Sequence, residues 1–331
     1  TFRWQTANAC GQFQDIAALA FPVPAGEDKS ATLATRTPTT ASCELPAPFT
    51  ARSLIVQPVQ KVNVTAELQV SDDGQQYRLV KKFTIDRHNV GLGVGPAPLA
   101  PIVATFPATT ARFFQLKFSQ ECELGEIRVS PAARVESYAE KSLLKMFQDP
   151  LPPFDYYQWP PSAEPESASL VIRPDAVRDI TRLLAPDGTL RWDVPPGDWL
   201  VLRTAMTPTG TRNAPAPPEA TGYEVDKMNR VALKAHFDAY IGNLLRRVPA
   251  AKRKSLKHVV ADSYEQGPEN WTDGFDSIFQ RRYHYNPMPW LPVLTGRVVG
   301  SAEQSDRFLW DLRRLVAELV AREYVDALSD C

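Results

Sequence analysis

The spacing of apolar residues changes once along this chain, and the change limits what the chain can fold into. In the front part apolar side chains recur at every second position, as in Phe114, Leu116 and Phe118, whereas after Thr207 they recur at helical spacing. A period of two predicts strands with one buried face, and a period near 3.6 predicts amphipathic helices. We therefore expect a multidomain α+β protein, with an antiparallel β-sandwich followed by an α/β part.

Turn residues separate the predicted strands of the front part. Asp72, Asp73 and Gly74 form a turn between two alternating runs, which predicts a hairpin with one buried face. The alternating positions are Val62, Val64, Ala66, Leu68 and Val70 before the turn and Tyr77, Leu79 and Lys81 after it. Ile127 and Val129 add a short strand, and residues 1–48 show only an apolar run at 16–23. We expect the sandwich to occupy residues 1–135.

Residues 136–206 combine proline-rich segments with short apolar runs. Residues 140–147 have the spacing of a helix, whereas the prolines at 150–153 and 160–161 cannot continue one. Short strands are predicted at 170–172, 190–194 and 199–205, with turns at Gly188 and Gly197 between them. We interpret this region as a linker with a small β subunit.

Three helices are predicted after residue 207. Residues 230–247 carry an apolar stripe behind Asn229, a suitable N-cap. Residues 275–283 form a second helix, with Asp273 available as its cap. The sequence from Ser301 to Gln304 resembles a capping box and opens a third helix.

Residues 255–272 hold the strongest functional signal. The apolar run at 258–261 predicts a buried parallel strand, and Asp262, Tyr264 and Glu265 follow it, with Asn270 and Trp271 nearby. Catalytic groups lie at this end of the strands in α/β folds. Aromatic, carboxylate and amide groups together suit a sugar site. The alternative is that Asp262 caps a turn and Trp271 belongs to the core.

The overall composition excludes several classes of protein. Lys and Arg total 37 against 38 Asp and Glu in 331 residues, so no nucleic acid or anionic membrane is indicated as a partner. No apolar run is long enough for a membrane span, and the N-terminus lacks the pattern of a signal peptide. Four cysteines lack zinc-site spacing, although one disulfide is possible. The compartment stays open, and two N-glycosylation patterns, at Asn63 and Asn270, favour export.

An ordered series of motifs resembles glycoside hydrolase family 106, the α-L-rhamnosidases. The matching segments are 190–203 (LRWDVPPGDWLVLR), 207–210 (TPTG), 224–227 (EVDK), 260–265 (VADSYE), 270–272 (NWT), 279–286 (FQRRYHYN) and 291–294 (LPVL). The front part, with 49–54 (FTARSL), 68–74 (LQVSDDG) and 111–116 (ARFFQL), is similar to a discoidin-like, galactose-binding jelly roll.

The resemblance implies a (β/α)8 barrel, of the TIM type, interrupted by β domains. It also implies inverting hydrolysis of terminal α-L-rhamnosyl residues of glycans or glycosides, with help from calcium. A complete barrel takes about 250 residues, so residues 207–331 account for only part of one. We therefore expect a fragment that lacks the first and last barrel strands and that has little or no activity alone.

An inverting glycosidase needs a protonated carboxyl group and a carboxylate that activates water. Glu265 is the candidate general acid, because the neighbouring apolar run and Trp271 would raise its pKa by desolvation. The second carboxylate is Asp262, Glu224, Asp226 or a residue beyond Cys331. Tyr264, Asn270, Trp271, Glu224 and Asp226 are the candidate substrate-binding residues.

Several alternatives stay open. Glu224 and Asp226 precede a helix, where carboxylates are stabilised by the helix dipole, or they ligate calcium or sugar hydroxyls. Asn270 orients a hydroxyl or closes the loop. The competing functions are a non-catalytic carbohydrate-binding protein and a hydrolase of the same architecture that acts on another sugar.

Overall fold

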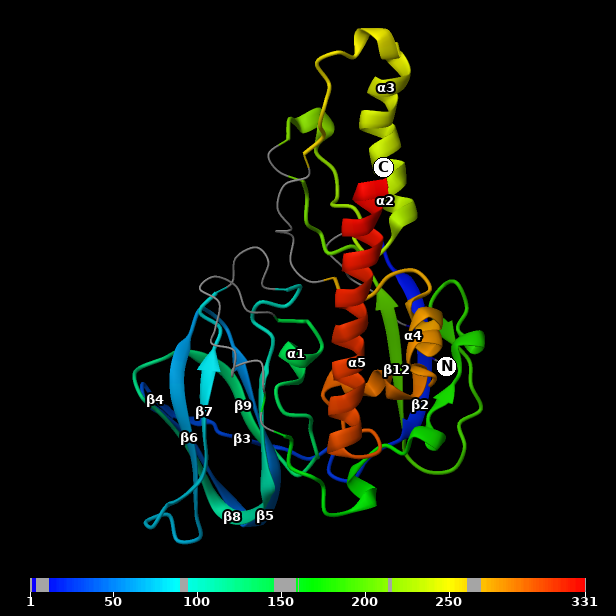
Figure 1. Ribbon diagram of the computed structural model, residues 1–331. Coiled ribbons are helices and arrows are strands. Elements are labelled where there is room, and N and C mark those ends of the chain that lie inside the picture. The colour runs from blue at the N-terminus through cyan, green and yellow to red at the C-terminus, as the bar shows by residue number, and fades with distance from the viewer. Residues whose placement is uncertain are drawn as a thin grey trace.

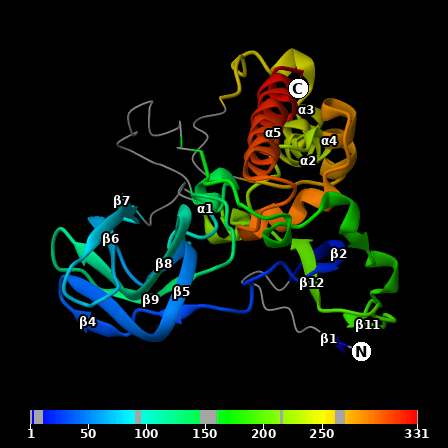
Figure 2. The same ribbon diagram turned by 90° about the horizontal axis from the view of Figure 1, so that it is seen from below.

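Three β-sheets of unequal size and a set of helices make up the described part of the fold (Figure 1). The structure is a computed structural model that describes residues 2–3, 12–89, 95–145, 159, 161–213, 216–260 and 269–330. The larger sheet lies to one side, and the helices pack beside the smaller sheet (Figure 2). None of the helices in these ranges is long and apolar enough to cross a lipid bilayer.

The larger sheet contains seven antiparallel strands. In space they run β3, β9, β5, β8, β6, β7, and β4 pairs with β5. Their bounds are β3 Ala31–Thr32, β4 Thr35–Thr37, β5 Thr40–Pro58, β6 Asn63–Ser71, β7 Arg78–Asp86, β8 Ile102–Phe118 and β9 Leu124–Ser130. The predicted antiparallel β region is thus confirmed.

Strands β5 and β8 pair along most of their length, and two register shifts interrupt the pairing. One half of the pair adjoins β9 and the other half adjoins β6. Residues from both ends of the sheet share one core, for example Val56 and Ile127 with Leu68 and Leu116. The sheet must therefore curl around this core (Figure 2). The two described cysteines of this part, Cys43 and Cys122, are free thiols.

The hairpin β6–β7 is present, but its second strand differs from the prediction. Val62, Val64, Ala66, Leu68 and Val70 are buried as the alternation predicts. Leu79 is 55% exposed, however, because a register shift between Leu68 and Gln69 pairs it with Gln69. A shift of one residue moves side chains to the opposite face, so the prediction that Leu79 faces inward is wrong.

The smaller sheet joins segments that are far apart in the sequence. Strand β2 (Gln14–Pro22) lies between β10 (Arg178–Asp179) and β12 (Trp199–Met206), and all pairings are antiparallel. A separate pair joins β1 (Phe2–Arg3) to β11 (Thr189–Leu190). Residues 17–21 are buried on both faces, which explains their continuous apolar run. Strand β2 was predicted to belong to the sandwich of residues 1–135, but it pairs with β12. In the sequence, the seven-stranded sheet is therefore inserted between two paired strands of the smaller sheet.

Helices follow the predicted pattern after residue 207. The segment 230–247 is continuous: α2 (Arg230–Phe237), the π-helix η6 (Asp238–Gly242) and α3 (Asn243–Arg247). Helix α4 (Phe275–Tyr283) has Gly274 at its N-cap instead of the expected Asp273. Helix α5 (Ala302–Val320) begins at Ser301, whose hydroxyl accepts a hydrogen bond from Gln304 N, and continues into the π-helix η9 (Ala321–Asp326) and α6 (Ala327–Asp330).

The remaining helices are short. Helix α1 (Tyr138–Lys141) covers four residues, whereas the sequence predicted a helix at 140–147. The 3-10 helices are η2 (Ala168–Leu170), η3 (Pro174–Ala176), η4 (Thr181–Leu183), η5 (Pro218–Ala220), η7 (Ala250–Lys252) and η8 (Met288–Thr295). Helices α4, α5 and η8 and strand β2 share one core, which includes Phe21, Phe279 and Phe308. Its aromatic rings form close pairs, such as Phe279 and Phe308 at 5.7 Å.

Two predicted strands are absent from the described residues, and the one predicted at 190–194 is reduced to the two residues of β11, with Val194 54% exposed. Residues 258–260 were predicted to start a buried parallel strand, but they form no strand, and Val259 and Val260 are 54% and 83% exposed. A buried parallel strand needs a parallel neighbour and a cover on both faces of its sheet, whereas the named strands of the described chain pair only antiparallel. At 170–172 the chain forms η2, followed by one isolated parallel bridge between Ile172 and Val299.

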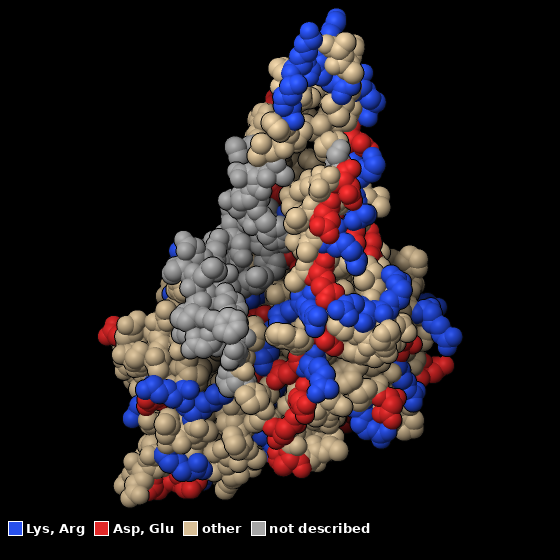
Figure 3. Space-filling model, in the orientation of Figure 1, with Lys and Arg blue, Asp and Glu red and all other residues tan. Residues whose placement is uncertain are grey.

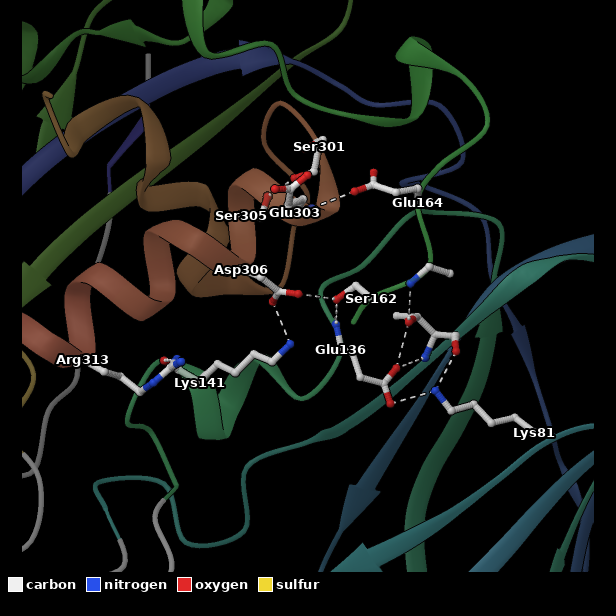
Figure 4. Close-up of polar contacts among 12 residues, drawn as sticks. Lys81, Glu136, Lys141, Ser162, Glu164, Ser301, Glu303, Ser305, Asp306 and Arg313 are labelled. Carbon is white, nitrogen blue, oxygen red and sulfur yellow. Dashed lines mark hydrogen bonds and ion pairs between the residues drawn. The ribbon is translucent and has the colours of Figure 1, made fainter. Parts of the chain in front are cut away.

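A polar network attaches the larger sheet to α5 (Figure 4). On the sheet side, Glu136 accepts hydrogen bonds from Lys81 Nζ and Thr105 Oγ1, both at 2.8 Å. On the helix side, Asp306 accepts from Lys141 Nζ at 2.7 Å and from Ser162 Oγ at 3.3 Å. Ser162 also accepts from Glu136 N, so it connects the two halves.

The first turn of α5 receives a further anchor from the chain beside this network. Glu164 accepts hydrogen bonds from the backbone N–H groups of Ala302 and Glu303. These N–H groups have no partner inside the helix, and a carboxylate beside them is also favoured by the helix dipole. The junction therefore combines buried ion pairs with a capped helix.

Charged side chains on the outside are interleaved along α5 in Figure 3, whereas basic side chains gather at the tip formed by the end of α3 and the residues that follow it. The basic residues there are Arg246, Arg247, Lys252, Arg253, Lys254 and Lys257.

Candidate functional site

The turn before α2 is fixed by side-chain hydrogen bonds. Asn229 adopts an extended backbone conformation and its Oδ1 accepts from Val231 N at 3.0 Å, which starts the helix. Asp226 Oδ1 accepts from Met228 N at 2.8 Å, and Asp226 Oδ2 accepts from the Thr272 hydroxyl at 2.5 Å. Asp226 therefore ties this turn to the segment before α4.

Glu269 contacts the same turn from the segment before α4. Its Oε2 accepts a hydrogen bond from Lys227 N at 2.9 Å. Burial, together with the negative charge of Asp226, raises the pKa of Glu269 to about 7. A hydrogen bond to the Asp226 carboxyl group acts in the same direction, because it favours a retained proton. Glu269 is thus a carboxyl group that changes its protonation near neutral pH.

Lys227 supplies the positive charge of the site. Its side chain is 3% exposed, and its Nζ donates to Glu224 Oε2 at 3.2 Å. The same Nζ lies 5.8 Å from the centre of the Tyr324 ring, on η9. Burial raises the pKa of Tyr324, and the charges of Glu224 and Glu269 add to this effect. We call Glu224, Asp226, Lys227, Glu269 and Thr272 the Glu269 cluster.

The Glu269 cluster has the chemical composition of an acid–base site. A carboxyl group with a pKa near neutrality is suited to proton transfer at physiological pH. Perturbed pKa values also gather at functional sites, although structural ion pairs produce them as well. The alternative is a purely structural role. Asp226 and Glu269 accept hydrogen bonds from Met228 N and Lys227 N, and these bonds hold the turn before α2 in place.

The predicted site residues have separate positions. Glu224 and Asp226 lie together in the Glu269 cluster. The Asn270 side chain donates to Ser142 O at 3.3 Å, so its amide anchors the loop to the end of α1. Trp271 packs its ring 4.6 Å from that of Phe275, against the core. Asp262, Tyr264 and Glu265 lie outside the described residues.

Sequence reasoning missed Glu269, Lys227 and Thr272 as members of one site. The available signal was the position of Glu269, an acid between Pro268 and the pair Asn270–Trp271. Its partner Lys227 is 42 residues away in the sequence, and nothing in the sequence shows that contact.

Calcium, which the sequence resemblance implies, needs six to eight oxygen ligands around one point. No group of three or more His, Cys, Asp or Glu side chains within the described residues is placed to hold a metal ion. In the Glu269 cluster the carboxylate oxygens already accept from Lys227, Met228 and Thr272. The described donors therefore do not fit a calcium site by themselves.

Comparison with known proteins identifies the family. Residues 3–331 match the sequence profile of glycoside hydrolase family 106, described as alpha-L-rhamnosidase. The chain belongs to glycoside hydrolase family 106. Its fold resembles the structure of a rhamnosidase from Novosphingobium sp. PP1Y, with a TM-score of 0.76 and 29% sequence identity over 96% of this chain. The family assignment made from the motifs is thus confirmed.

A further relative covers a smaller part of the chain. A Formosa agariphila protein named "Putative beta-glucuronidase" is 38% identical over 160 residues, which is 48% of this family 106 chain. The chain corresponds to 14% of that protein and to 32% of the Novosphingobium rhamnosidase. It therefore spans a minor part of both relatives.

Proposed function

We propose that this chain forms part of an inverting glycoside hydrolase that removes terminal α-L-rhamnosyl residues from glycans or glycosides. Family membership over residues 3–331 supports glycoside hydrolysis on a carbohydrate substrate. The observation that carries the proposal furthest is Glu269, whose pKa is raised to about 7 and which lies four residues after Glu265 in the sequence. This segment of the chain thus holds acids on both sides of Gly267 and Pro268.

In the proposed reaction Glu265 donates a proton to the leaving oxygen. A carboxylate on the opposite face activates water, and in an inverting enzyme the two groups stand roughly 6.5–9.5 Å apart. Glu269 and Asp226 accept hydrogen bonds from the adjacent backbone N–H groups of Lys227 and Met228, so they are too close to form such a pair together. We assign Glu269 a positioning role, and Asp262, Glu224, Asp226 or a residue outside this chain is the partner of Glu265.

Sugar recognition is assigned to the polar and aromatic residues of the same region. Tyr264, Asn270, Trp271, Glu224 and Asp226 are the proposed substrate-binding residues. Aromatic side chains cover the apolar face of a sugar ring, and carboxylates and amides hold its hydroxyls. Calcium stays part of the proposal only through the family resemblance, and no step of the reaction above uses the metal.

The architecture proposed for the whole enzyme follows the same resemblance. Residues 1–135 would contain a galactose-binding jelly roll, 136–206 a linker with a small β subunit, and 207–331 part of a (β/α)8 barrel. The curled antiparallel sheet supports the first of these assignments, and the barrel rests on family membership. Export from the cell is also proposed, on the N-glycosylation pattern at the exposed Asn63.

A panel of substrates tests the proposed specificity. The full-length protein is incubated with aryl α-L-rhamnoside and with aryl β-D-glucuronide, the second because of the name of the Formosa relative. We expect turnover of the rhamnoside. NMR of the released sugar should show inversion of the configuration at the anomeric carbon. Turnover of the glucuronide alone would assign another sugar. Binding of rhamnosides without turnover of either substrate would favour a non-catalytic carbohydrate-binding protein.

A further inference from the structure

A cavity of about 270 Å³ lies where the larger sheet meets the α1 and η8 region. Its floor comes from strands β5, β8 and β9, and its wall comes from Arg134, Tyr138 and Thr295. None of its lining residues belongs to the Glu269 cluster. The volume is just below the range of about 300–1,000 Å³ for ligand sites, so it suits a ligand no larger than one monosaccharide.

The floor is the outer face of the sheet. Ile55 pairs with Val103 of β8 on one side and with Arg128 of β9 on the other. Residues directly opposite in antiparallel strands point to the same face, so these three side chains lie in one row across the sheet. Their neighbours Leu54 and Val56 point inward to the core. Val103 is only 2% exposed, so Ile55 supplies the accessible apolar surface of this row, with one guanidinium at its edge.

The wall carries excess positive charge. Glu27 lies between two arginines, with Arg134 Nη1 at 2.7 Å from one oxygen and Arg297 Nη2 at 2.5 Å from the other. Arg297 also donates to Thr295, which lines the cavity, and its Nε is buried without a partner among the described residues. One carboxylate thus faces two guanidinium groups, and one positive charge is uncompensated.

Hydrogen-bond donors remain at the rim of the cavity. Arg128 contacts Glu126 through Nε at 3.2 Å, and within the described chain its two terminal nitrogens have no further ion-pair partner. The Tyr138 hydroxyl likewise makes no hydrogen bond to a described residue, while the ring packs against Gly296. Guanidinium and phenol groups are donors that match a carboxylate. With Glu126 included, three guanidinium groups face two carboxylates.

We propose that this cavity is a second ligand site, separate from the proposed hydrolytic site, which takes a monosaccharide-sized ligand that bears a carboxylate. Its carboxylate contacts Arg128 and Tyr138, and the apolar face of its ring lies on Ile55. Chemically this is the class of the uronic acids. The inference rests on the cavity and its charges and does not depend on rhamnosidase activity.

Calorimetric titration of the full-length protein at low ionic strength tests the site. The probes are D-glucuronate, its neutral counterpart methyl D-glucoside, and acetate, which has the charge without the ring. We expect glucuronate to bind with a Kd of about 1 mM or tighter, which small ligands of this size reach. Methyl glucoside and acetate are each expected to bind at least roughly tenfold more weakly.

Two variants locate the binding. Arg128→Gln removes the guanidinium from a side chain that is 40% exposed, and we expect roughly tenfold weaker binding of glucuronate. Ile55→Trp fills the floor and should abolish binding. The matched control is Arg112→Gln, because Arg112 is also 40% exposed on the same sheet and also pairs with a glutamate, Glu44. The control should bind like the wild type.

Three results would overturn the proposal. The first is no binding of glucuronate at concentrations up to about 10 mM. The second is binding that Arg128→Gln and Ile55→Trp leave unchanged, which would place the ligand elsewhere. The third is equal binding of acetate, which would remove the assignment of a sugar-sized ligand.

Discussion

Glu269 and Asp226 accept hydrogen bonds from adjacent backbone N–H groups, those of Lys227 at 2.9 Å and Met228 at 2.8 Å, although the two acids come from segments before α4 and before α2. Two adjacent carboxylates repel each other, so a proton retained on one of them stabilises the contact. The geometry of this turn is therefore linked to the protonation of Glu269.

The stability of the protein is expected to fall as pH rises past the ordinary pKa of glutamate. The folded-state pKa of Glu269 is raised from 4.5 to about 7, so between these values the native state binds more protons than the unfolded state. Its stabilising contribution is then complete below about pH 4.5 and is lost as pH rises through about 7. In the wild type this loss amounts to roughly 3 kcal/mol of unfolding free energy at pH 8. Glu269→Gln imitates the protonated form, so the variant should not show the loss. Urea unfolding of the wild type and of Glu269→Gln at pH 4.5, 6 and 8 measures the free energy of unfolding of each.

The control for this experiment is Glu303→Gln. Glu303 is a 74% exposed side chain in the first turn of α5, and the variant should keep the pH dependence of the wild type. If Glu269→Gln lost stability at pH 8 and kept the wild-type slope, the proposed retained proton would be wrong.

Lys227 is expected to be more important for stability than a surface lysine. Removing one partner of a buried ion pair leaves an uncompensated charge, so Lys227→Met should cost about 3 kcal/mol. In a Glu224→Gln background the same change should cost less, because the partner charge is already absent. Denaturant unfolding of the two single variants and the double variant measures the coupling. Additive losses would show that the 3.2 Å contact between Lys227 and Glu224 contributes no coupling energy.

Asp306 is expected to hold the larger sheet against α5 (Figure 4). Lys141 is 4% exposed and donates to Asp306 at 2.7 Å, so Asp306→Asn leaves a buried ammonium without its counter-ion. We expect a loss of about 3 kcal/mol in the free energy of unfolding. Glu303→Gln on the same helix breaks only an exposed pair with Arg307 and should cost less than about 0.5 kcal/mol. Similar losses for the two variants would contradict the role of the network.

A side chain at Gly296 is expected to destabilise the fold. Its φ is +81°, and a Cβ there would lie 2.7 Å from Cδ1 of Tyr138. Gly274 provides a control, because its φ is +68° and a Cβ there would meet nothing within 4 Å. Gly274→Ala should cost about 1 kcal/mol for the backbone alone, and Gly296→Ala roughly 2 kcal/mol more. Thermal unfolding measures the loss of stability in the two variants. Equal losses in Gly274→Ala and Gly296→Ala would mean that the Tyr138 ring moves away at no energetic cost.

Local patterns predicted the parts of the fold that local physics decides. The alternation from Val62 to Val70 gave the buried face of β6, and Asn229 and Ser301 marked the starts of α2 and α5. The Leu79 error came from a register shift, which depends on the partner strand. Strand β2 gave no alternation because both of its faces are buried, and its pairing with β12 connects residues far apart in the sequence.

The candidate site was predictable only in part for the same reason. Glu224 and Asp226 were identified from their motif, but their contacts with Glu269 and Thr272 arise from the tertiary fold. The apolar run at 258–260 suggested a strand, yet Val260 is 83% exposed. An apolar run shows that a segment can be buried. Whether it is buried depends on another part of the fold that packs against it.

The most direct test of the central claim compares two leaving groups. Wild-type and Glu265→Gln full-length proteins are assayed on nitrophenyl α-L-rhamnoside and on a rhamnosyl disaccharide. Nitrophenolate departs with little protonation, whereas a sugar hydroxyl needs the acid. The account predicts that Glu265→Gln loses about 10²–10⁴-fold in kcat on the disaccharide and far less on the nitrophenyl substrate. Equal losses on the two substrates, or no loss on the disaccharide, would contradict Glu265 as the general acid.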